Sequence, residues 1–184
     1  RTTKMTVRLQ EKGVDRRCGS LDSVVGRFLN EQGETTETRL QNLVFVTEVY
    51  ATTYCRRRLT GAEFRPYMYG AYSPDVSETL SDSQCVTEHR RLKNGNRTTV
   101  YSFDGSNPKM DDSRETIVES VSDYTSGVDT DTLAQFSKDS WLFEHTPEDD
   151  PMQFTAFRDA LDRSSDLEQR VKLRLPAEPE VDCD

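Results

Sequence analysis

The stretch from residue 36 to residue 56 constrains the fold most, because its apolar side chains are too dense for a surface helix. Eight apolar or aromatic residues recur there at helical spacing: Leu40, Leu43, Val44, Phe45, Val46, Val49, Tyr50 and Tyr54. A helix of this composition has no continuous polar face to present to water, so it must be buried on most sides. We therefore expect a central helix at 36–56 with the remaining elements packed around it.

Five further segments show helix signals. Ser20 precedes an apolar pattern of period 3.6, and Gly33 follows it, which predicts a helix over 21–31. Ser73 followed by Pro74 is a capping residue with proline at the first helical position, which predicts a short helix over 74–81. Similar patterns predict helices at 113–125, 129–138 and 153–163.

One β-hairpin is predicted after the short helix. Residues 85–92 and 97–103 flank Asn94-Gly95, and Asn-Gly is the strongest two-residue turn signal between antiparallel strands. The order of short helix and hairpin is that of a winged helix. The fold class is therefore mainly α (α+β): a compact helical domain with one wing-like hairpin.

The chain divides into three parts by composition. Of its 184 residues, 33% are hydrophobic and 31% are charged, so a lean core must be concentrated in the patterned segments. Those segments predict a single helical domain over 20–163, preceded by a flexible N-terminal arm at 1–19. Charged residues and then Pro176 to Pro179 predict an extended or disordered acidic tail at 164–184.

The charge balance limits the partners. The formal net charge of -9 argues against general binding to phosphates, because a nucleic-acid surface normally carries a basic footprint. However, 6 Lys against 18 Arg, with abundant Asp and Glu, is a composition associated with salt-loving archaea, where surface acidity serves solvation. High salt also screens electrostatic steering, so in a halophilic protein the acidity says less about partners.

The cysteines and the hydropathy predict a reduced, soluble protein. Cys18, Cys55, Cys85 and Cys183 are widely spaced, with no CxxC pair, so we expect no metal site and reduced, partly buried thiols rather than disulfides. No apolar run approaches the roughly 20 residues that span a bilayer, and no secretory signal is recognisable. These features predict no membrane partner and a cytoplasmic location.

Sequence motifs of catalysis are nearly absent. The chain has no phosphate loop, no H-E-x-x-H, no G-x-S-x-G and no GxGxxG after a strand. His89 and His145 lie in contexts typical of solvated side chains, and the acidic clusters at 111–112 and 148–150 lack the pattern of a calcium loop. We expect a protein that is not an enzyme and has no cofactor.

An aromatic cluster is the most informative local feature. Phe64, Tyr67, Tyr69 and Tyr72 lie within nine residues around Pro66 and Gly70. Packing against the central helix could use most of these rings, but any that are exposed would anchor a protein partner. We predict these four residues and Trp141 as partner-binding.

Three motifs in order resemble a known family. They are the buried helix from Leu40 to Tyr54, the turn Tyr69-Gly70-Ala71-Tyr72-Ser73-Pro74, and the later run from Leu133 through Phe136 and Lys138 to Trp141. Together they resemble the SocA-like antitoxins, also called the Panacea family, over about 20–162. The chain has Ala71 where that family usually has Pro, and Lys138 where it usually has His.

The resemblance implies a compact helical domain that often neutralises a partner toxin by direct contact. In at least one branch of the family the domain delivers the toxin to a protease as an adaptor. It implies no cofactor. An antitoxin-like protein-binding module is therefore the leading hypothesis, with the partner's identity and the oligomeric state left open.

Two alternatives remain. In a winged-helix transcriptional regulator, residues 74–81 would read DNA, and the hairpin would contact phosphates through four basic side chains: Arg90, Arg91, Lys93 and Arg97. Against it, Asp75, Glu78 and Asp82 would face a polyanion. A hydrolase using an acidic pair has no positive feature beyond the abundance of carboxylates.

Overall fold

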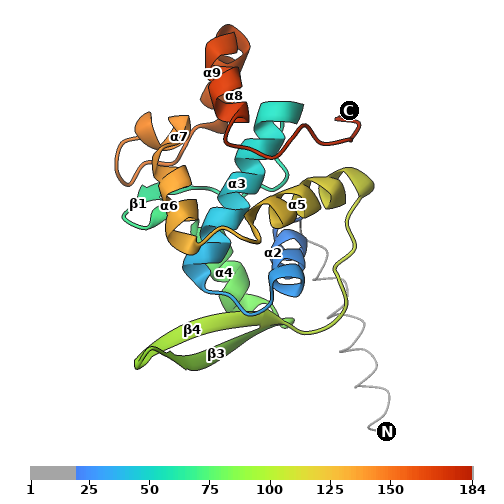
Figure 1. Ribbon diagram of the computed structural model, residues 1–184, viewed down its shortest axis with the longest axis vertical. Coiled ribbons are helices and arrows are strands. Elements are labelled where there is room, and N and C mark those ends of the chain that lie inside the picture. Colours follow the sequence, from blue (N-terminus) through green and yellow to red (C-terminus); the bar gives the residue numbers. More distant parts are fainter. Residues whose placement is uncertain (1–19, 184) are drawn as a thin grey trace, which may run out of the picture.

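The computed structural model describes residues 20–183; the predicted arm at 1–19 lies outside the described residues. Its elements, labelled as in Figure 1, are α2 (Ser20–Gln32), α3 (Glu37–Cys55), β1 (Arg65–Tyr67), β2 (Gly70–Tyr72), α4 (Pro74–Asp82), β3 (Val86–Lys93), β4 (Asn96–Phe103), α5 (Asp112–Thr125), α6 (Thr130–Lys138), α7 (Trp141–Glu144), α8 (Phe154–Arg163) and α9 (Ser165–Lys172). The predicted class, mainly α with a hairpin, is confirmed. The predicted helices are present, each with bounds within about two residues of those expected.

Helix α3 is the centre of the molecule, and the other helices pack around it (Figure 1). Every residue from Leu40 to Thr53 is buried, as the density of apolar residues required. The helix begins at a capping side chain, because Thr36 Oγ1 accepts a hydrogen bond from the Arg39 amide. It ends at Arg56, whose positive φ of 54° turns the chain out of the helix while its amide still bonds to Thr52 O.

Two buried charges are fully partnered. Glu48 on α3 has no exposed side chain, and its carboxylate accepts hydrogen bonds from Arg58 and, at 2.7 Å, from the Thr60 amide. Arg27 on α2 is 6% exposed and binds three carboxylates. Glu31 lies on the same helix, and Glu115 and Glu119 lie on α5. A buried charge without such partners would strongly destabilise the fold, so both groups have structural roles.

Two antiparallel hairpins project from the helices. The aromatic turn predicted around Gly70 is the hairpin β1–β2, with Tyr67 opposite Gly70. The predicted wing is the hairpin β3–β4, with Lys93 opposite Asn96 and the turn at Asn94-Gly95. Its base is fixed to the chain between α2 and α3, because Thr35 and Tyr101 exchange backbone hydrogen bonds of 3.1 and 2.8 Å. In Figure 1 this hairpin lies at the opposite end of the molecule from α8 and α9.

The prediction of an extended or disordered tail at 164–184 was wrong for much of that segment. Ser164 caps helix α9, accepting a hydrogen bond of 3.2 Å from the Leu167 amide. Leu167, only 8% exposed, attaches this short helix to the core. The sequence signal was weak because only two apolar residues, Leu167 and Val171, pack this helix of eight residues against the core.

The expectation of reduced thiols was wrong for two of the cysteines. Cys55 and Cys183 form a disulfide, although 128 positions separate them in the sequence. The fold places their Cα atoms 5.1 Å apart, a distance typical of disulfides. Cys85 is a buried free thiol. None of the helices within residues 20–183 combines the length and hydropathy required to cross a bilayer.

Candidate functional site

Three consecutive large side chains are exposed at the turn of the β1–β2 hairpin. Tyr67, Met68 and Tyr69 are 49%, 63% and 58% exposed, and we call these three residues the aromatic tip. The Tyr67 ring meets the Tyr69 ring edge-on, with 5.7 Å between centroids, and lies 5.6 Å from the Tyr72 ring. Large apolar and aromatic side chains are more often buried than exposed, so their clustering on a protruding turn makes this turn a candidate contact surface.

Buried amides of α3 hold the hairpin in place. Asn42 Nδ2 donates to Tyr69 O at 3.2 Å and to Thr38 O at 2.8 Å, while its Oδ1 accepts from Ser137 Oγ on α6 at 2.6 Å. Gly70 permits this approach: its φ is +107°, and a Cβ atom there would lie 2.4 Å from Asn42 Oδ1. The turn therefore requires glycine at position 70, because any larger residue would be strained at this φ and would collide with Asn42.

A second amide on α3 anchors the end of the hairpin. Gln41 Oε1 accepts from the Ser73 amide at 2.7 Å, and Gln41 Nε2 donates to Ser73 O at 2.9 Å. Ser73 in turn caps α4 by accepting from the Val76 amide. The exit of the hairpin and the start of α4 are thus held by the same buried side chain.

Tyr72 supports the tip from below. It is partly buried, and its hydroxyl lies 3.0 Å from Ser77 Oγ on α4, which donates to Glu37 Oε1 on α3 at 2.6 Å. Tyr72 therefore joins the hairpin to two helices and offers only part of its ring to a partner. Its predicted contact role stays a prediction.

Two of the five predicted partner-binding residues pack against other parts of the domain. Phe64 is wrong as a contact residue, because it is 0% exposed and packs edge-on against Phe45, with 5.4 Å between centroids. Trp141 is half-buried on α7, where it stacks on His145 at 4.2 Å and lies 5.7 Å from the Phe157 ring. Both rings pack against other side chains of the domain, which is the alternative to partner binding that the sequence left open for the aromatic cluster.

Met68 is a candidate contact residue that was not predicted from the sequence. It is the most exposed member of the aromatic tip. The sequence carried no clear signal for this, because only the structure shows that Tyr67 pairs with Gly70, which makes Met68 and Tyr69 the two residues of a tight hairpin turn. A two-residue turn directs both of its side chains outward from the end of the hairpin.

The β3–β4 hairpin does not gather its four basic side chains into one patch. Directly opposite residues share a face of an antiparallel pair, and neighbours along a strand alternate. Leu92 pairs with Arg97, so Arg90 and Arg97 lie on one face, and Arg91 and Lys93 lie on the other. The end of the β3–β4 hairpin is also apolar on one face, since Leu92 is 78% exposed.

Carboxylates lie close to the face of β3–β4 that carries Arg91 and Lys93. Arg91 Nη2 lies 2.7 Å from Glu34 Oε1, and this hydrogen bond lowers the pKa of Glu34 below its ordinary value. Lys93 borders a groove of about 990 Å³ whose lining includes Glu31, Glu119 and Asp123. Within residues 20–183, Arg90, Lys93 and Arg97 form no ion pair.

The outer side of α4 is acidic. A groove of about 1130 Å³ runs between α4, the start of β3 and the segment that follows β4. Its charged lining residues are Asp22, Asp75, Glu78, Asp82, Asp104 and Lys109. Partial burial of Asp22 raises its pKa, which a hydrogen bond to Thr79 partly offsets. This surface would repel a nucleic-acid backbone.

Within residues 20–183, neither histidine has a carboxylate among its hydrogen-bond partners. No group of three His, Cys, Asp or Glu residues within 20–183 is arranged to hold a metal ion. His89 Nε2 lies 2.7 Å from Ser102 Oγ, and His145 Nδ1 lies 2.8 Å from Trp141 O. The first contact joins β3 to β4, and the second joins the residue that follows α7 to the first residue of that helix.

In comparisons with known proteins, the chain matches no family model, no curated protein and no solved structure.

Proposed function

We propose that this chain is a non-catalytic protein-binding module, comparable in action to the SocA-like antitoxins, and that the aromatic tip contacts its partner. The observation that carries the proposal is the exposure of Tyr67, Met68 and Tyr69 on a turn that buried amides hold rigidly. Tyrosine supplies a large contact area with few rotatable bonds, and tyrosines are enriched among residues that dominate binding energy. A pre-organised turn also loses little entropy on binding.

The partner that fits this tip is a protein with an apolar pocket or groove, and a toxin is such a partner under the antitoxin-like hypothesis. The location proposed for the complex is the cytoplasm. Because the contact is apolar, its affinity should change little with salt, which suits a chain of halophilic composition.

The test is co-isolation of the partner at high salt, followed by reconstitution from two purified proteins. The double variant with Tyr67→Ser and Tyr69→Ser should raise the dissociation constant of the complex about 100-fold or more. The matched control is Tyr124→Ser on α5, a tyrosine that is 47% exposed away from the hairpin. Equal binding by the tip variant and the wild type would sink the proposed contact surface.

A DNA-binding regulator is the second candidate, and one observation favours it. Arg90 and Arg97 share a face of a protruding hairpin and form no ion pair within residues 20–183. The acidic groove beside α4 stands against it, because the helix that would read the major groove is bordered by carboxylates. A DNA complex would weaken steeply with salt and with Arg90→Ala and Arg97→Ala, but not with the tip variants.

A further inference from the structure

The acidic groove beside α4 has an apolar floor. The groove has a volume of about 1130 Å³, and its lining begins in the first turn of α2. Ala62 and Cys85 are buried lining residues, and Leu21, Phe103 and Pro108 are partly buried ones. We call these five apolar residues the floor of the groove. A hollow of this size exceeds most small-molecule pockets, so it can hold a segment of polypeptide.

Five carboxylates line the same groove. Asp75, Glu78 and Asp82 follow one another at spacings of three and four residues, so they lie on one face of α4. Asp22 on α2 and Asp104, the residue after β4, are the other two. Within residues 20–183, none of the five forms an ion pair. Because like charges on one helix face repel each other, a cationic segment placed among them would stabilise this surface.

The arm at 1–19 carries the opposite charge. It contains six basic residues and two acidic ones, which gives a net charge of +4. Since the whole chain carries -9, residues 20–184 carry -13. The basic residues of the arm are Arg1, Lys4, Arg8, Lys12, Arg16 and Arg17. A basic segment is thus joined to the helix whose first turn lines the groove.

Chain connectivity keeps part of the arm close to the groove. Leu21 and Asp22 follow Ser20 directly, and both are lining residues. A polypeptide spans at most about 3.6 Å per residue, so the Cα atom of Arg17 lies within about 11 Å of the Cα atom of Ser20. Arg16 is one residue further away. Both guanidinium groups can therefore reach the end of the groove at Asp22.

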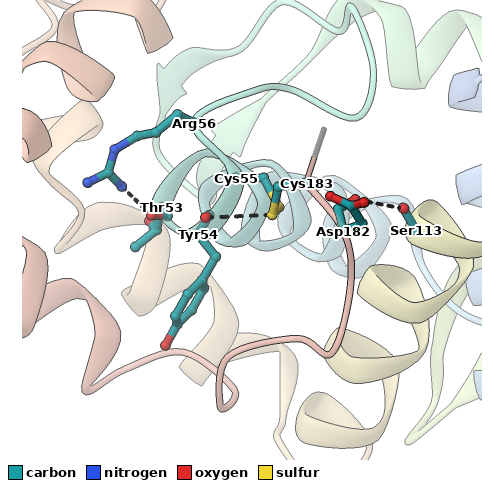
Figure 2. The surroundings of a disulfide bond; sticks show 7 residues. All are labelled: Thr53, Tyr54, Cys55, Arg56, Ser113, Asp182 and Cys183. Atoms are coloured by element: carbon teal, nitrogen blue, oxygen red, sulfur yellow. Dashed lines mark hydrogen bonds between the residues drawn. A yellow bond between two sulfur atoms is a disulfide. The ribbon is translucent and has the colours of Figure 1, made fainter.

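The other end of the described chain does not take part in this groove. Figure 2 shows Cys183 bonded to Cys55, the last residue of α3, with Ser113 of α5 close by. None of these three residues lines the groove. Of the two ends of the described chain, the N-terminal one therefore places its adjoining segment beside the carboxylates.

We propose that the arm at 1–19 docks in the acidic groove of its own chain, with Arg16 and Arg17 facing Asp22 and the carboxylates of α4. Because the arm and the groove belong to one chain, the effective concentration is high, and weak surface ion pairs are sufficient to hold the arm. Contacts with the apolar floor add a part of the attachment that salt does not screen. The docked arm covers the exposed face of α4 and keeps other macromolecules from it.

This docking is independent of the proposed partner contact, because no residue of the aromatic tip lines the groove. The two proposals therefore fail separately. Loss of binding in the tip variants says nothing about the arm, and the position of the arm says nothing about the tip.

The test is zero-length coupling of the full chain with a carbodiimide, followed by mapping of the linked peptides by mass spectrometry. This reagent joins a lysine amine to a carboxylate in direct contact with it. Lys4 or Lys12 should couple to at least one of the five groove carboxylates, and Lys109, which lines the groove, provides an internal control. Coupling of Lys109 to the groove without coupling of either arm lysine would overturn the docking.

An isotope mixture distinguishes docking within one chain from docking between two copies. Equal amounts of unlabelled and ¹⁵N-labelled protein are mixed before the coupling reaction. Linked peptides in which both halves carry the same label support docking within one chain. Linked peptides that combine a labelled half with an unlabelled half would show that the arm comes from a second copy and would overturn the proposal.

Two double variants test the charge pairing. Glu78→Gln with Asp82→Asn should lower the yield of coupling between the arm and the remaining groove carboxylates about fivefold, because two exposed ion pairs are lost. The matched control is Glu148→Gln with Asp150→Asn, the same change of charge at two exposed residues outside the groove, and it should keep the wild-type yield. Equal yields from the two variants would contradict the proposed role of the carboxylates of α4.

Discussion

The two hairpins of this protein are built by opposite means. Buried side chains of α3 bond directly to the turn and exit of β1–β2. In contrast, the attachments of β3–β4 lie at its base and along its edge: the bridge from Thr35 to Tyr101, core packing at the base and the Arg91–Glu34 ion pair. The first hairpin exposes an apolar tip on a fixed support, and the second exposes separated charges on a projecting ribbon. Hydrogen bonds from buried side chains and a cluster of large exposed side chains occur together in β1–β2, which is why we propose the partner contact there.

Matched glycine substitutions should show the largest difference between the hairpins. Gly70→Ala should destabilise the fold by about 3 kcal/mol or more, because it adds backbone strain to a clash with Asn42 and Ala134. Gly95→Ala in the turn of β3–β4 also has a positive φ, but no atom lies within 4 Å, so only about 1–2 kcal/mol is expected. Chemical denaturation of both variants measures the difference, and equal losses would contradict the proposed steric role of Asn42.

Loss of the anchoring amide should have the next largest effect. Asn42→Ala removes the donor to Tyr69 O and the acceptor for Ser137 Oγ in a fully buried site, at about 2–4 kcal/mol. Asn96→Ala, an exposed change in β4, should alter the free energy of unfolding by less than about 0.5 kcal/mol. Faster amide exchange at Tyr69 and Gly70 in the first variant alone would confirm that the amide fixes the tip.

The attachment of β3–β4 to the body should respond to pH. The hydrogen bond from Arg91 lowers the pKa of Glu34 below its ordinary value of 4.5. The stability that this ion pair contributes to the fold is therefore fully present above the ordinary pKa, and it is lost as the pH falls through the lowered pKa. We expect a smaller effect than in the two preceding variants, because both side chains are exposed. An NMR titration of the Glu34 carboxylate should show the low pKa, and Arg91→Ala should return it toward 4.5. A normal pKa in the wild type would contradict the ion pair.

The smallest effect on stability is expected at the aromatic tip. Tyr67→Ser and Tyr69→Ser should each change the free energy of unfolding by less than about 0.5 kcal/mol, since both side chains are about half exposed and the buried Asn42 bonds to the backbone of Tyr69, which the substitutions leave in place. Thermal denaturation measures this quantity. A large loss would show that the tip serves folding rather than partner contact.

Local signals in the sequence were sufficient for most elements. Ser73-Pro74 marked the start of α4, Asn94-Gly95 marked the turn of β3–β4, and the apolar density of 36–56 identified α3 as the centre. Each of these signals acts within a few residues, through a cap, a turn conformation or a helical period. The aromatic turn was recognised as a cluster, but not as a two-stranded hairpin, because strands of three residues leave almost no pattern.

The sequence by itself determined the helical class, the central helix, the wing-like hairpin and the presence of an aromatic cluster beside Gly70. The tertiary structure decided which rings of that cluster are exposed, because burial of Phe64 and exposure of Met68 depend on what packs beside them. It also decided the attachment of the tail, since the disulfide joins residues 128 positions apart. Local preferences set the elements, whereas such distant contacts exist only after the chain has folded.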